Sequence, residues 1–353
     1  MSAGCLRAVG RLGAAGAGTR RGVVALMALL LVACVPEQPE REATSASAQT
    51  AEATPDGKGA ADGVLAFRVT PPPDVQGQTP AASLLLPSRH YHQPGLLRPG
   101  PEVLDGRRAL VVETDPDGRA HPETMRTGSH DFVALFGERG AELVRSRLRC
   151  GGVHFPEVAE PFAVWRRSTV RCPAERRGVR IAPALLEGVD FEREAEAEAR
   201  RRGLPVLFAE TREEMWRYTI AVPPEVYFNA ARREVADPSA PQRRIEARPA
   251  RNALLNQGAL DALYALQREE FGGSEEDWRE FERFLLVGRN AVMARRLDRH
   301  LRDPGAVLAL LGAAHFPGPH GVVERLRAMG HRVEPVRLPP GRWPARDGVR
   351  PGG

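Results

Sequence analysis

The sequence predicts an α/β fold in which a mostly parallel central sheet is flanked by helices, with a helical insertion before the last β-α-β unit. Three observations lead to this prediction. Short apolar runs rich in Leu and Val alternate with helical patterns, as expected of a buried parallel sheet. A polar residue follows each run directly. Glycine or a capping side chain marks the helix boundaries.

The first 33 residues have the features of a bacterial lipoprotein signal peptide. Four arginines and no acidic residue precede a short apolar run, residues 23–33, which ends at Cys34. The run is well below the ~20 apolar residues that a membrane-spanning helix requires. Residues 31–34 match the lipobox, whose cysteine receives acyl chains, so we expect Cys34 to anchor the protein to a membrane. An ordinary signal peptide cleaved near an incidental cysteine is the alternative.

The expected location is the cell envelope. Val35 rather than Asp follows Cys34, which favours the outer membrane facing the periplasm. Once the signal peptide is removed, 46 basic residues stand against 45 acidic ones, so the charge balance gives no support for a nucleic-acid partner. The expected partners are the membrane and a peptide or small-molecule ligand, and the oligomeric state is left open.

Two cysteines remain for the folded part of the chain. Cys150 and Cys172 would lie in an oxidising compartment, where we expect them to form a disulfide bond. Such a bond would contribute ~3 kcal/mol to stability. The alternative is a pair of free thiols.

Composition divides the mature chain into a tether, one domain and a tail. Residues 34–63 contain almost no large apolar side chain and are expected to be a flexible tether. Residues 64–340 are expected to form the α/β domain, with insertions at 116–180 and 246–302, and residues 341–353 a disordered tail. The predicted strands are 83–86, 109–112, 204–208 and 307–311, with a returning strand at 332–336. The predicted helices include 132–148, 252–270, 274–302 and 322–329, together with one capped by Asp190 and one begun by the capping box of Thr211 and Glu214.

Polar residues with metal-binding or acid-base chemistry follow four of these strands. In an open α/β sheet, ligands collect at the carboxyl ends of the strands. His90, Glu113, Glu210 and His315 all occupy that position. Two imidazoles and one or two carboxylates would suit a divalent transition metal or acid-base catalysis. The alternative for each residue is an ordinary helix cap or loop side chain.

Several of these residues resemble motifs of a known family. Gly312-Ala313-Ala314-His315, followed by Phe316-Pro317-Gly318 and then Gly330-His331-Arg332-Val333, is similar to the carboxyl-terminal signature of the TraB/GumN family, which includes the TIKI metalloproteases. Pro87-Ser88-Arg89-His90 resembles the first of the family's two GxxH motifs, and Leu110-Val111-Val112-Glu113 its Val-Val-Glu motif. Gly188-Val189-Asp190, Glu210-Thr211 and Arg289-Asn290 resemble its middle section and its Arg-Asn pair.

The resemblance implies a fold of the erythromycin-esterase and haem-lipoprotein type (EreA/ChaN-like). In the TIKI branch it implies peptide hydrolysis that depends on manganese or cobalt, with zinc as a further possibility. His90, His315 and Glu113 would then be metal ligands, with Glu210 as a further candidate from its position at a strand end. Glu113 could alternatively act as the general base. Arg289 and Asn290 would orient the substrate or a carboxylate.

One residue departs from the family pattern. Pro87 stands where the first motif has glycine, and proline fixes φ and removes a backbone donor. His90 could therefore be displaced, with His92 as a substitute ligand. The leading hypothesis is a lipid-anchored, metal-dependent hydrolase of a peptide or similar amide. The alternatives are an envelope lipoprotein that binds haem or another ligand without turnover, and an interaction protein that has lost the site.

Overall fold

The computed structural model describes residues 63–73, 80–89, 91–92, 95–115, 129–150, 152–153, 155–169, 189–237 and 239–343. Several expectations concern residues outside these ranges, namely the signal peptide, Cys34, the tether up to residue 62, His90, Cys172 and the tail from residue 344. Those expectations stay predictions. Among the described residues, no helix combines the length and the apolar content that crossing a bilayer would require.

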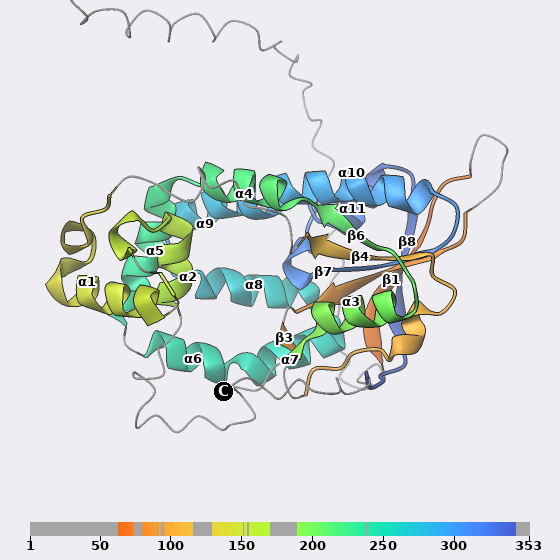
Figure 1. Cartoon of the computed structure of the whole chain (residues 1–353), viewed down its shortest axis with the longest axis horizontal. Coiled ribbons are helices and arrows are strands. Elements are labelled where there is room, and N and C mark those ends of the chain that lie inside the picture. Colours follow the sequence, from red (N-terminus) through yellow and green to blue (C-terminus); the bar gives the residue numbers. More distant parts are fainter. Residues whose placement is uncertain are drawn as a thin grey trace, which may run out of the picture. The chain divides into compact units, whose positions relative to one another are not determined.

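The centre of the domain is a six-stranded sheet with the strand order β6-β4-β7-β2-β1-β8. Its strands are β1 (Val64–Thr70), β2 (Ser83–Ser88), β4 (Ala109–Thr114), β6 (Val206–Glu210), β7 (Val307–Gly312) and β8 (Arg332–Leu338). β6, β4, β7 and β2 pair in parallel, whereas β1 runs antiparallel to both of its neighbours. The expected α/β fold with a mostly parallel sheet is therefore confirmed (Figure 1).

The antiparallel edge of the sheet differs from the sequence expectation. β1 was not among the predicted strands. It pairs with β8 along its whole length, from Val64 opposite Leu338 to Thr70 opposite Arg332. β8 therefore returns to the sheet with β2 and β1 between it and β7, and not next to β7 as a compact β-α-β unit would. A second, two-stranded sheet pairs β3 (Tyr91–His92) with β5 (Val189–Asp190) in antiparallel fashion.

One face of the sheet is covered by α7 (Arg248–Gln257), α8 (Leu260–Glu270), α10 (Arg289–Arg302) and α11 (Val322–Ala328). Met293, Leu297 and Leu301 of α10 are fully buried against alternate residues of the strands. This apolar stripe has the spacing of one helix face. α10 was expected to belong to an insertion, but it is part of the cover of the sheet.

The opposite face is covered by α3 (Phe191–Arg201) and by the end of the described chain. Trp343 is buried, packs edge-to-face on Phe191 and donates its indole N–H to the carbonyl of Pro99 at 2.7 Å. The packed part of the chain thus extends to residue 343, into the segment that was expected to be a disordered tail.

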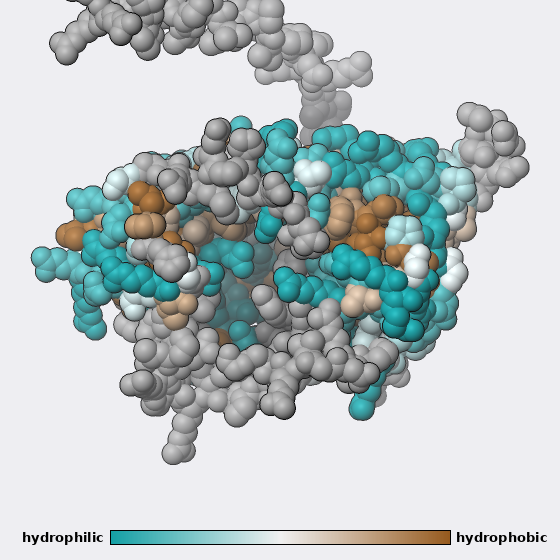
Figure 2. Space-filling view, viewed as in Figure 1, coloured by the Kyte–Doolittle hydropathy of each residue, from teal (hydrophilic) through white to brown (hydrophobic). Residues whose placement is uncertain are grey.

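Further helices lie beyond the ends of the strands. They are α1 (Phe132–Cys150), α2 (Pro161–Ser168), α4 (Arg212–Ala221), α5 (Pro224–Ala236), α6 (Ala240–Glu246) and α9 (Glu275–Glu282) (Figure 1). An aromatic cluster that includes Tyr227, Trp278 and Phe281 holds several of them together. Between this helical part and the sheet, the face in view is hollowed, and the residues seen in the hollow are hydrophilic (Figure 2).

Two expected helices are interrupted. Residues 252–270 form two helices because Gly258 has φ of 78°, a left-handed conformation that ends α7. α9 and α10 are joined by a π-helical segment, Arg283–Gly288, directly before Arg289. π-helical turns are rare and frequently lie at functional sites. Cys150 is exposed and unpaired among the described residues, and pairing with Cys172 stays a prediction.

Candidate functional site

The sheet brings the carboxyl ends of its parallel strands to one edge. Ser88 of β2 lies opposite Gly312 of β7, and Thr114 of β4 lies opposite Glu210 of β6. The side chains that leave these strand ends therefore share one edge of the sheet, where ligands bind in open α/β folds.

A buried ion-pair cluster occupies this edge. Arg289, from the first turn of α10, donates its Nη2 to Oε1 of Glu113 at 2.7 Å and also to Oε1 of Glu210. Its Nε lies 3.1 Å from both carboxylate oxygens of Glu210. Thr114 adds a hydroxyl donor to Oε1 of Glu210 at 2.6 Å. All three charged side chains are buried, and Glu210 has no exposed surface.

The electrostatics of this cluster decide the charge of Arg289. Burial lowers the pKa of Arg289, but the negative charges of Glu113 and Glu210 outweigh burial and raise the pKa above its ordinary value. Arg289 is therefore permanently charged. When both carboxylates are ionised, the single guanidinium leaves one net negative charge in this buried cluster.

Asn290, the next residue of α10, fixes the tautomer of His315. Its Oδ1 lies 2.6 Å from Nδ1 of His315, and its Nδ2 donates to the carbonyl of His320 at 3.0 Å. Because the amide nitrogen is committed to that carbonyl, the oxygen must face the imidazole, so Nδ1 of His315 carries the proton. In the neutral form of the imidazole, Nε2 then carries the lone pair. Both Asn290 and His315 are buried.

The free nitrogen of His315 faces Glu113. Nε2 lies 3.4 Å from Oε1 of Glu113, and the other oxygen of this carboxylate accepts the backbone N–H of Gly312 at 2.6 Å. A Cβ at position 312 would lie only 2.8 Å from that oxygen. The φ of Gly312 is −55°, which any residue can adopt, so the backbone conformation does not require glycine here. Glycine is required because the carboxylate of Glu113 leaves no space for a Cβ.

Five of the residues singled out from the sequence are brought together here, namely Glu113, Glu210, Arg289, Asn290 and His315. Arg289 contacts the carboxylates of Glu113 and Glu210, and the expectation that Arg289 and Asn290 orient the substrate or a carboxylate stays a prediction. His90 lies outside the described residues, as does the side chain of His92. Sequence reasoning missed Thr114, whose position next to Glu113 at a strand end was the available signal.

The donor chemistry of the described residues fits a divalent transition metal in part. An imidazole nitrogen and a carboxylate oxygen are ligands that manganese, cobalt and zinc accept, and a metal-bound histidine usually donates its other N–H to an oxygen, as His315 does to Asn290. The net negative charge of the cluster also favours a cation. Among the described residues, however, no group of three potential ligands is assembled.

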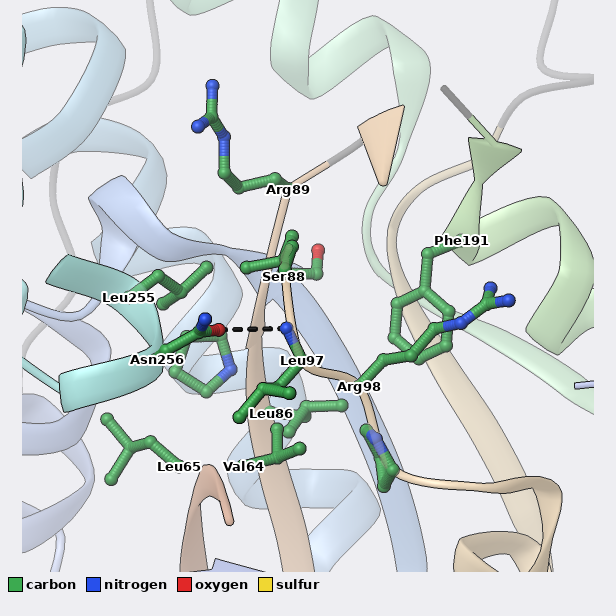
Figure 3. Close-up of a pocket in the computed structure, with 13 residues that line it drawn as sticks. Val64, Leu65, Leu86, Ser88, Arg89, Leu97, Arg98, Phe191, Leu255 and Asn256 are labelled. Carbon is green, nitrogen blue, oxygen red and sulfur yellow. Dashed lines mark hydrogen bonds between the residues drawn. The ribbon is translucent and has the colours of Figure 1, made fainter. Parts of the chain in front are cut away.

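Two cavities lie near this edge. One of about 520 Å³ is lined by Asn290, Ala314 and His320 on one side and by Tyr264 and Arg268 of α8 on the other. This volume is in the range of small-molecule sites. The second, of only about 20 Å³, lies beside β2 between apolar residues and the polar side chains of Ser88, Arg89, Arg98 and Asn256, and holds no more than a water molecule. Figure 3 shows its lining, with the 2.8 Å hydrogen bond from Leu97 N to Asn256 Oδ1 across it.

Comparison with known proteins agrees with the motif resemblance. Residues 167–335 match the family model described as the TraB/PrgY/gumN family. The matched segment contains Glu210, Arg289, Asn290 and His315, and it begins after Glu113. No curated protein and no solved structure matches the chain. Residues 167–335 of the chain are therefore assigned to the TraB/PrgY/gumN family.

Proposed function

We propose that this protein is a metal-dependent hydrolase that acts on a peptide or a similar amide outside the cytoplasm, anchored to a membrane through lipid on Cys34. The observation that carries the proposal is the pair formed by His315 and Glu113. Asn290 accepts the Nδ1 proton of the imidazole, and Nε2 lies 3.4 Å from Oε1 of Glu113. Family membership and the lipobox sequence support the class and the location.

In this proposal His315 Nε2, Glu113 Oε1 and His90 would hold the metal ion, which would polarise the scissile carbonyl and make water acidic at neutral pH. Asn290 would keep Nδ1 of His315 protonated, so that Nε2 stays available. Arg289 and the N–H of Gly312 would hold the Glu113 carboxylate in place. In the alternative arrangement, Glu113 Oε1 would not bind the metal and would accept a proton from the attacking water.

The cavity of about 520 Å³ supplies space for a substrate next to the cluster. Its wall includes Asn290 and Ala314, which are sequence neighbours of Arg289 and His315. A bound peptide segment in this cavity would therefore contact Asn290, which bonds to His315 of the cluster. Acidic residues such as Asp261 and Glu269 give its rim a hydrophilic character.

Metal analysis tests this proposal. Purified full-length protein loaded with manganese, cobalt or zinc should retain about one metal ion per chain, measured by mass spectrometry of the elements. His315→Ala and Glu113→Gln should lose it. His331→Gln is the matched control, because His331 is also buried and bonded to a carboxylate, that of Asp298 at 2.7 Å, and belongs to no part of the cluster. Absence of metal from the wild-type protein under every loading condition contradicts the proposal.

A ligand-binding lipoprotein without turnover is the second candidate. It is favoured by Arg289, which already pairs with Glu113 Oε1, and by Pro87 in the position of the first glycine. Titration with haem distinguishes it. A Soret band in a protein that takes up no metal would favour this candidate over the hydrolase, and the absence of the band would remove the haem version.

A further inference from the structure

Arg89 lies at the same edge of the sheet and is not used by the proposed chemistry. It follows β2 directly, one residue after Ser88, which lies opposite Gly312. Figure 3 shows its side chain extending beyond the strand end, away from the apolar residues Leu86 and Leu255. Arg89 is therefore next to the strand end whose partner, Gly312, donates to Glu113.

Arg89 contacts a helix that carries further positive charge. Its Nη1 donates to Oδ1 of Asn252 in α7 at 3.2 Å. Arg248 stands four residues before Asn252 and thus on the same helix face, and Arg251 is the adjacent residue. The guanidiniums of Arg251 and Arg248 act on Arg89 electrostatically, and Glu270 is the carboxylate that opposes them.

That carboxylate is already engaged. Glu270 Oε1 accepts from Nε of Arg251 at 3.0 Å and also from its Nη2. Arg89, in contrast, bonds only the neutral amide oxygen of Asn252 among the described residues. Arg89 is partly buried, and the guanidiniums of Arg251 and Arg248 bring like charge to its side chain. A half-buried guanidinium next to like charges is unfavourable unless an anion compensates it.

We propose that Arg89, with Arg251 and Arg248 beside it, binds a carboxylate group of the ligand at the edge of the sheet. A guanidinium presents N–H donors in a planar fork that matches a carboxylate in two parallel hydrogen bonds. With Nη1 held by Asn252, the remaining donors of Arg89 are oriented for such a ligand. The subsite thus selects peptides with a free terminal or side-chain carboxylate. Its assignment to a substrate rests on the proposed hydrolase function, whereas binding of the anion does not.

Equilibrium binding of two matched peptides tests the subsite without any turnover. The probes are acetyl-trialanine with a free carboxylate and the same peptide as its amide, titrated by calorimetry into the purified full-length protein. A charge-assisted hydrogen bond of ~1.5–3 kcal/mol corresponds to a preference of roughly 10- to 100-fold for the free acid. Arg89→Gln should reduce this preference to about twofold or less, whereas Arg89→Lys should retain part of it.

Arg98→Gln is the control for loss of one positive charge. Arg98 lies on the neighbouring segment but is already paired with Glu194, so the preference for the free acid should be unchanged. Thermal unfolding of each variant checks that the fold is intact, and Arg89→Gln still offers a side-chain donor to Asn252. A preference that survives in Arg89→Gln overturns the proposal, and so does a wild-type protein that binds both peptides equally or neither.

Inorganic phosphate distinguishes the kind of anion. Phosphate that competes more strongly than acetate for the subsite would overturn the assignment to a carboxylate, and weaker competition would support it. These outcomes are separable from the hydrolase proposal. Metal uptake without a preference for the free acid would support the hydrolase proposal and overturn the subsite. A preference for the free acid without metal uptake would support the subsite and contradict the hydrolase proposal.

Discussion

Replacing Arg289 with Met should destabilise the protein more than any exposed arginine replacement, because one guanidinium compensates two buried carboxylates. Removing one partner of a buried ion pair costs ~3–5 kcal/mol. Glu113 and Glu210 are 5% and 0% exposed, so neither can turn to water when Arg289 is removed. We therefore expect the upper part of that range, and a fall in melting temperature of roughly 10 °C or more.

The measurement is urea denaturation at pH 8 and pH 5, followed by circular dichroism. The loss should be smaller at pH 5, because protonation of one carboxylate removes the repulsion between them. Glu210→Gln in the Arg289→Met background should restore part of the stability at pH 8 for the same reason. The control is Arg296→Met on the same helix, whose ion pair with Glu214 is partly exposed and should contribute less than ~1 kcal/mol. A loss in Arg289→Met no larger than in Arg296→Met, without dependence on pH, would refute this reasoning.

Three further predictions concern other parts of the molecule. Asn290→Ala should release the tautomer of His315 and destabilise the fold by ~1–3 kcal/mol, since it leaves a buried N–H and a carbonyl unpaired; nitrogen chemical shifts of the imidazole that still report only Nδ1–H would contradict it. Burial raises the pKa of Glu160 to about 7, so the stability that this group contributes is present below about pH 4.5 and lost as pH rises through 7. Glu160→Gln should accordingly be more stable than wild type at pH 8, by ~1–3 kcal/mol after allowance for solvent screening, and equal to it at pH 4.5; an unchanged pH profile of unfolding would exclude this. Trp343→Ala should cost ~3 kcal/mol in thermal unfolding because it empties a buried site against Phe191, and a change below ~1 kcal/mol would show that the last described residues contribute little.

The parallel strands could be predicted from the sequence because a strand buried on both faces is a short continuous apolar run. The four predicted strands agree with β2, β4, β6 and β7 to within two residues at each end. β1 was missed because strand pairing with β8 joins the two ends of the domain, and no local pattern specifies a partner so distant in the chain. The same distance explains why β8 was placed next to β7.

The sequence predicts those site residues that directly follow a predicted strand. Glu113, Glu210 and His315 follow apolar runs, so their meeting at one edge follows from the parallel sheet. The contacts of Arg289 with both carboxylates depend on the rotation of α10, which the π-helical segment sets and which no residue pattern reveals. The role proposed for Arg89 could not be predicted either, because it depends on contacts with residues of α7, which are remote in sequence.

The π-helical segment Arg283–Gly288 has a consequence for how insertions and deletions are tolerated in this protein. A π turn holds one residue more than an α turn, so the segment works as a spacer between a helix docked in the aromatic cluster and a helix docked on the sheet. Deleting a single residue there would turn the two dockings out of phase by roughly a quarter of a turn. The length of this short segment is therefore under stricter constraint than the identity of most of its side chains. A homologue one residue shorter would need a guanidinium at another position to pair with the carboxylates of Glu113 and Glu210.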